Sequence, residues 1–111
     1  VRGGYFLEVE ILSKIKIKLR DKKGVFHNYE QNWVPTRKLM ESFEIDSQTY
    51  PTNKEYYEKT INFVASVFDD KRVTYDAILD GVAANELDDF MEGFFSQMMG
   101  GTDPNLEPEN E

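Results

Sequence analysis

Aliphatic residues alternate with lysines near the start of the chain. Residues 14–19 read KIKIKL, so every second side chain is apolar. This period of two predicts a strand with one buried face and one wet face. A turn signal follows at Asp21–Gly24, and residues 25–30 (VFHNYE) read as a second strand, which together predict a β-hairpin. The lysines are explained more simply by the wet face and edge of a hairpin than by a phosphate-binding stripe.

The next apolar pattern, in residues 32–46 (NWVPTRKLMESFEID), changes to helical spacing. Pro35 suits a first helical turn, and Leu39, Met40 and Phe43 fall on one face. Trp33, just before the helix, is expected with Val34 to staple it to the sheet.

A longer helix is predicted after residue 52. Thr52 and Glu55 form a T-x-x-E capping box at its start. Its apolar positions recur at the spacing of a core-facing stripe: Tyr57, Ile61, Val64 and Phe68.

Two more helices are expected in the last third. Thr74 is placed to cap a short helix, and Gly81 is a natural C′ residue, which would follow that helix in a left-handed conformation. Asn85 is expected to cap the last helix, which Gly100 and Gly101 would stop. Its apolar residues form one continuous stripe: Leu87, Phe90, Met91, Phe94, Phe95, Met98 and Met99.

These elements predict an α+β fold, with an N-terminal β-hairpin followed by a small bundle of about four α-helices. Residues 13–100 are expected to form a single domain, since a chain of 111 residues supports one modest core. Our hypothesis is that residues 1–12 are a non-native or poorly ordered N-terminal extension. Residues 101–111 have little to bury and are expected to be a disordered acidic tail.

Charge is distributed unevenly along the chain. The net charge is −8, with all 13 Lys and Arg in residues 1–72 and ten acids but no Lys or Arg in residues 73–111. An acidic C-terminal third repels phosphate backbones, so we expect no nucleic-acid partner. No apolar run is long enough to span a bilayer, so we expect no membrane partner either.

Candidate chemistry is sparse. His27 is the single histidine and there is no cysteine, which excludes thiolate and His-rich metal sites. The pairs Asp69–Asp70 and Asp88–Asp89 lack the spacing of a calcium loop and fit turns and helix ends better. The sequence therefore predicts no catalytic residues, no metal and no cofactor, and a protein that is not an enzyme.

Binding is the remaining function class. The stripe on the last helix is either simply part of the core or an adaptable docking face, because the unbranched thioether of methionine packs against varied partners. A terminal helix of a domain this small cannot easily bury both flanks of such a stripe. The predicted partner-binding residues are Phe90, Met91, Phe94, Phe95, Met98 and Met99.

The chain also resembles a known family. A hairpin followed by WVPTRKLMESFEI (33–45), several helices and FFSQMMGG (94–101) before an acidic tail is similar to the tail assembly chaperones of long-tailed phages (siphophages) that infect Gram-positive bacteria, counterparts of the lambda-type chaperone. The resemblance covers roughly residues 13–105. It implies a cytoplasmic protein of the infected host that coats the phage tape measure protein and is not expected in the mature virion, with the major tail protein and further copies of itself as possible partners.

Two other readings compete with this one. The first is a structural joining protein of the tail or the head–tail connector, which would use the hairpin edge to build rings. The second is a small acidic inhibitor that mimics DNA, although its acids sit partly on the predicted disordered tail.

Overall fold

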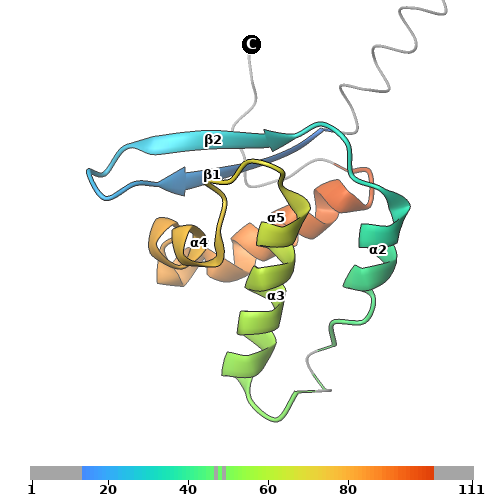
Figure 1. Ribbon diagram of the computed structural model, residues 1–111. Helices are drawn as coiled ribbons and strands as arrows, with labels where there is room; N and C mark the ends of the chain where they lie inside the picture. Colours follow the sequence, from blue (N-terminus) through green and yellow to red (C-terminus); the bar gives the residue numbers. More distant parts are fainter. Residues whose placement is uncertain (1–13, 47, 49, 102–111) are drawn as a thin grey trace, which may run out of the picture.

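The predicted hairpin is the first element of the computed structural model, which describes residues 14–46, 48 and 50–101 (Figure 1). The expectations for residues 1–12 and for the acidic tail beyond residue 101 lie outside the described residues. The elements are β1 (Ile15–Arg20), β2 (Phe26–Gln31), α2 (Thr36–Ser42), α3 (Asn53–Val67), α4 (Tyr75–Gly81), the 3-10 turn η1 (Ala84–Glu86) and α5 (Leu87–Met98). This is the predicted α+β arrangement, a two-stranded antiparallel hairpin followed by four α-helices in the described chain.

The hairpin turn forms where the sequence places it. The Gly24 amide donates to the Asp21 carbonyl at 3.0 Å, and Gly24 has a φ of +88°, a conformation that glycine adopts without a steric cost. The Asp21 carboxylate accepts from the amides of Lys23 and Val25 and lies 2.7 Å from His27 Nε2. These bonds fix the register, in which Ile17 lies opposite Tyr29.

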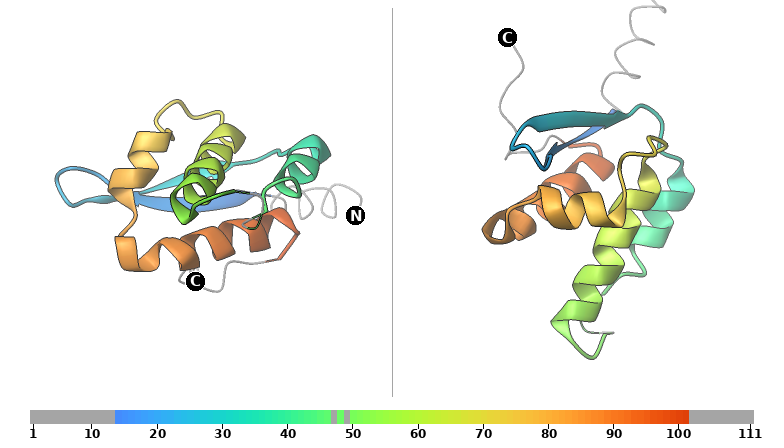
Figure 2. Two further views of the ribbon diagram at one scale, coloured as in Figure 1. Left: turned by 90° about the horizontal axis from the view of Figure 1, so that it is seen from below. Right: turned by 60° about the vertical axis from the view of Figure 1, so that its left-hand side comes forward.

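One face of β1 supplies the hairpin's share of the core. Ile15, Ile17 and Leu19 are 2–4% exposed, whereas the lysines between them lie on the other face. The four helices gather on the apolar side of the hairpin (Figure 2). The alternation of the sequence therefore predicted correctly which side of the strand would be covered.

The predicted cap of α3 is confirmed, and so is its core stripe except for Tyr57, which is half-buried and whose hydroxyl donates to Asp88 at 2.9 Å. Thr52 accepts a hydrogen bond from the Glu55 amide at 3.2 Å. Ile61 and Val64 are buried, and Phe68 just beyond the helix is 7% exposed. The buried surface is wider than the predicted stripe, since Thr60, Phe63 and Val67 are buried as well.

Two expectations for the segment between α3 and α5 are wrong. Gly81 does not follow α4 in a left-handed conformation but is its last residue, where a Cβ would lie 3.0 Å from Leu19 Cβ and 3.1 Å from the Arg20 carbonyl oxygen. It therefore allows α4 to pack closely on β1. Asn85 does not cap α5, because it lies within η1 and α5 begins without a side-chain cap. Thr74 does cap α4, by accepting from the Ala77 amide at 3.0 Å.

Helix α5 packs across β1. Phe94 is fully buried, with its ring centroid 6.3 Å from that of Phe63 and 6.4 Å from that of Phe68. One turn further, the Gln97 side chain accepts from the Lys16 amide and donates to the Lys16 carbonyl, both at 2.9 Å.

The predicted stop of α5 is confirmed. Gly100 has a φ of +92°, and the amide of Gly101 donates to the Ser96 carbonyl. This is the Schellman arrangement that glycine favours at helix ends.

The first prediction concerns the core. Replacing Phe94 with Ala should lower the free energy of unfolding by about 3–5 kcal/mol, because the ring is fully buried between α3 and β1. Met99→Ala is the control on the same helix, since a side chain that is 65% exposed should cost no more than about 0.5 kcal/mol. Urea denaturation followed by circular dichroism measures both. Equal losses in the two variants would contradict this account of the core.

The second prediction concerns the turn. The pKa of Asp21 is lowered from its ordinary value, first by the hydrogen bond with His27 and then by the Val25 amide. A lowered pKa in the folded state means that the bond stabilises the fold above the ordinary carboxyl pKa and that this contribution is lost as the pH falls through the lowered pKa. In a His27→Ala variant, NMR titration of the carboxyl carbons should show a higher pKa for Asp21.

Asp70 is the internal reference in that titration. Its pKa is lowered to about 2 by Arg72, whose guanidinium donates to it at 2.8 Å. The titration of Asp70 should not change in the His27→Ala variant. An Asp21 pKa that stays lowered without the imidazole would show that the backbone amides alone hold the carboxylate.

Candidate functional site

An apolar groove opens between α2 and the C-terminal half of α5. It has a volume of about 220 Å³, and we call it the α2–α5 groove. The short helix α2 and the residues after it form one wall, and α5 forms the other. Tyr56 of α3 also lines the groove. The lining residues are Leu39, Ser42, Phe43, Ile45, Tyr56, Phe95, Met98 and Met99.

The α2 wall is held in place without burying its apolar side chains. The helix has seven residues, no side-chain cap and no buried residue. Lys38 fastens it to α3, since its ammonium donates to Ser66 Oγ at 3.1 Å and lies 5.9 Å from the centroid of the Phe63 ring. Met40 and Phe43 are therefore left 51% and 60% exposed.

The α5 wall is anchored to the core from behind. The Phe95 ring stacks on Phe63 with centroids 6.0 Å apart and meets the Phe94 ring edge-on at 5.2 Å. Met98 is half-buried against the core, and Met99 is 65% exposed. The wall is thus a rigid aromatic base that ends in two flexible thioethers, which suits varied apolar partners.

The structure divides the six predicted partner-binding residues into two groups. Phe94 and Met91 are buried at 0% and 7% exposure. Phe90 is partly buried against the core and does not line the groove. Phe95, Met98 and Met99 line it together. The inner edge of the predicted stripe therefore belongs to the core, and its outer flank forms a surface.

Sequence reasoning missed the opposite wall. Leu39 and Phe43 share a face of the predicted helix, but nothing in the sequence pattern connects that face with the last helix, which it meets in the groove. The expectation that Trp33 staples α2 to the sheet is wrong, because its side chain is 74% exposed, whereas Val34 does pack against the core. The signal that could have indicated these exposed side chains is the shortness of α2. A helix of seven residues is too short to cover Trp33, Met40 and Phe43.

The residues that line the groove are uncharged, and the segments around it carry mostly acidic charge, although α2 itself also holds Arg37 and Lys38. Residues 39–53, which include the end of α2 and the loop after it, contain Glu41, Glu44 and Asp46 and no Lys or Arg. The described residues 73–101, which include α5, contain six acids and again no Lys or Arg. An apolar surface between two acidic segments favours a partner with apolar and basic side chains.

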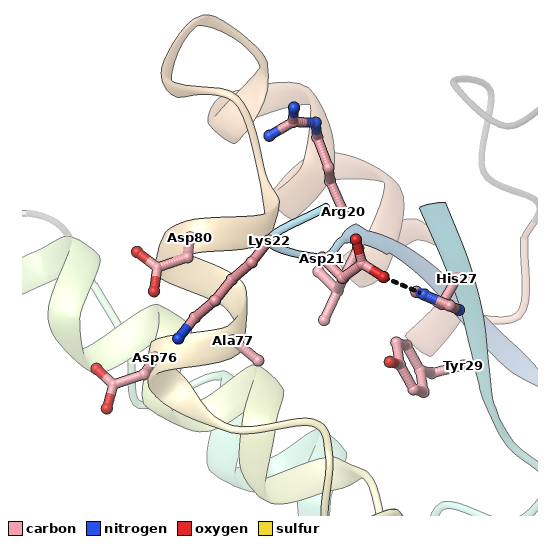
Figure 3. Close-up of a pocket in the computed structure, with 9 residues that line it drawn as sticks. Arg20, Asp21, Lys22, His27, Tyr29, Asp76, Ala77 and Asp80 are labelled. Atoms are coloured by element: carbon pink, nitrogen blue, oxygen red, sulfur yellow. Dashed lines mark hydrogen bonds and ion pairs between the residues drawn. The ribbon is translucent and has the colours of Figure 1, made fainter. Parts of the chain in front are cut away.

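A second pocket lies between the hairpin turn and α4 (Figure 3). It has a volume of about 530 Å³, and its lining mixes the cations Arg20 and Lys22 with Asp76 and Asp80 of α4. An acid–histidine pair needs a nucleophile beside it to act in catalysis, and the described residues that line this pocket include no Ser, Thr or Cys.

Two further features of the described residues bear on other functions. No group of three or more His, Cys, Asp or Glu side chains among residues 14–46, 48 and 50–101 could hold a metal ion. In the same part of the chain, no helix combines the length and the apolar character needed to cross a membrane.

Comparison with known proteins gives one match. The family described as phage tail chaperone protein matches residues 12–111, which is most of the chain. No curated protein and no solved structure matches it. The match agrees with the resemblance carried by the segments 33–45 and 94–101, which contain much of both groove walls. This chain belongs to the phage tail chaperone family.

Proposed function

We propose that this protein is a non-enzymatic tail assembly chaperone that binds and solubilises the phage tape measure protein through the α2–α5 groove. Family membership supports the role in tail assembly. The observation that carries the finer proposal is the exposed apolar groove between α2 and α5, because such a surface suits an amphipathic helix. A helix with apolar residues on one face and Lys or Arg beside them is the client segment that fits it.

The size of the groove implies weak binding by each copy. Fully burying an apolar side chain contributes about 1.5–3 kcal/mol, and the groove offers Phe43, Met98 and Met99 as partly exposed contacts. The loss of translational and rotational freedom on association offsets much of this. Reversible binding by many copies along one client is the behaviour expected of a chaperone that must later leave.

The proposed site of action is the cytoplasm of the infected bacterium, before the tail tube closes around the tape measure protein. The net negative charge of the chain opposes association of copies whose groove is unoccupied. Because the chaperone must leave the tape measure protein before the tube closes, the protein is proposed to be absent from the finished virion.

The third prediction tests the groove. Co-expression with the tape measure protein should keep that client soluble, and the double variant Phe43→Ser, Met99→Ser should reduce the soluble client at least about tenfold, since two apolar contacts worth more than 1.4 kcal/mol together are lost. Both side chains are mostly exposed, so the variant should unfold at the same urea concentration as the unmodified protein.

Leu79→Ser is the matched control. Leu79 is 47% exposed on α4 and does not line the groove, so this variant should solubilise the client as well as the unmodified protein. The proposal is wrong if the client is no more soluble with the protein than without it, or if the groove variant and the control behave alike. Mass spectrometry of purified virions tests the remaining part, because a structural joining protein would persist there in fixed copy number.

A further inference from the structure

The two edges of the hairpin are covered differently. On β1, the Gln97 amide of α5 pairs with the backbone of Lys16 through two hydrogen bonds of 2.9 Å. Close to the turn, Gly81 of α4 lies against Leu19 and the Arg20 backbone, so closely that a Cβ there would be 3.0–3.2 Å from them. The outer edge of β1 is therefore occupied by the protein's own helices.

The outer edge of β2 has no such cover in the described part of the chain. Because the Lys16 amide faces α5, its neighbours Ile15 and Ile17 face β2, and the alternation of an antiparallel ladder places the backbone groups of Asn28 and Glu30 on the far side of β2. The sheet ends there, with β2 as its outer strand (Figure 1).

The residue types of β2 do not protect this edge. Natural edge strands avoid unwanted pairing with lysines, prolines or bulges. The strand reads FHNYEQ and contains no Lys or Pro, and the lysines of the hairpin sheet lie on β1, whose edge is already covered. Val25, just before β2, and Phe26, its first residue, are 51% and 59% exposed. A two-stranded hairpin is also marginal by itself and gains stability from further strands.

We propose that β2 pairs with β2 of a second copy around a two-fold axis, which makes a four-stranded antiparallel sheet. The backbone N–H and C=O groups that point away from β1 belong to the even-numbered residues of β2. In the dimer, each of these residues must therefore lie opposite an even-numbered residue of the second copy. The register with the longest overlap places Asn28 opposite Asn28 of the second copy and Phe26 opposite Glu30 of the second copy. This interface lies on the hairpin and leaves the α2–α5 groove open.

The charges of the hairpin agree with this register. Lys18 Nζ lies 5.9 Å from the centroid of the Phe26 ring, and Phe26 would face Glu30 of the second copy. Glu30 already pairs with Lys14 of its own chain at 3.2 Å, so Lys18 of the second copy would join this ion pair from across the interface, once at each of the two symmetric positions. The two β1 strands would lie three strand spacings apart, about 14 Å, which exceeds the Debye length of about 8 Å at physiological salt, so the repulsion between their lysines is screened.

Cysteine pairing tests the register, because the chain has no cysteine of its own. In the proposed sheet the Cα atoms of Asn28 and its copy lie about 5.5 Å apart, within the range that a disulfide spans. Under mild oxidation, Asn28→Cys should give a covalent dimer. Lys18→Cys is the matched control, since Lys18 lies directly opposite Asn28 in the same row and is likewise exposed, but is separated from its copy by about 14 Å. It should remain uncrosslinked.

Sedimentation equilibrium supplies the second readout. Asn28→Pro removes an outward amide that does not pair with β1, so the fold should persist while dimerisation weakens at least about tenfold.

The proposal is overturned if the unmodified protein stays monomeric up to millimolar concentration, which would leave the edge for an extended segment of another protein. It is also overturned if the two cysteine variants crosslink alike. It is equally overturned if the groove variant Phe43→Ser, Met99→Ser abolishes the dimer while Asn28→Pro does not. Client solubilisation is scored separately, so failure here does not count against the groove.

Discussion

The packing of α5 across β1 is the contact on which the rest of this fold depends. A two-stranded sheet has one apolar face and cannot bury it alone. The described chain covers that face with helices, and the α5 side chain at the centre, Phe94, is fully buried. The paired hydrogen bonds between Gln97 and Lys16 then fix how far the helix has rotated and slid along the strand. An apolar contact alone would leave the rotation of α5 and its position along β1 less well defined.

This fixed rotation also creates the candidate site. Successive residues of an α-helix are separated by 100°, so a helix that turns Met91 and Phe94 inward must place Phe95 and Met99 on its flank. The seven apolar positions of α5 form a stripe wider than the hairpin and α3 can cover. Helix α2 meets the uncovered flank but is fastened to α3 by Lys38 and buries none of its own residues. Core and groove are therefore two sides of one stripe, and stability and binding can be changed separately.

Local signals were enough to predict most of the elements, because alternation, capping and glycine turns act within a few residues. The hairpin turn at Gly24, the cap at Thr52 and the stop at Gly100 are all of this kind. Depth of burial was not predictable in the same way, because it depends on what lies opposite. Trp33 and Asn85 were assigned roles that their neighbours in sequence allow but that the tertiary packing does not use. The partition of the α5 stripe and the second wall of the groove depend on helix placement, which periodicity does not contain.

The separation of charge in the chain gives its two open surfaces different chemistry. Residues 14–31 hold six Lys and Arg against two acids, whereas residues 73–101 hold six acids and no Lys or Arg. The hairpin edge offers backbone hydrogen bonds in one register, and the groove offers adaptable apolar side chains between acids. In the proposed dimer each unit would carry two grooves, so that one bound groove raises the effective concentration of the other near the same client. Weak grooves joined in pairs by a sheet would hold a long helical client more firmly than single grooves and still release it one site at a time.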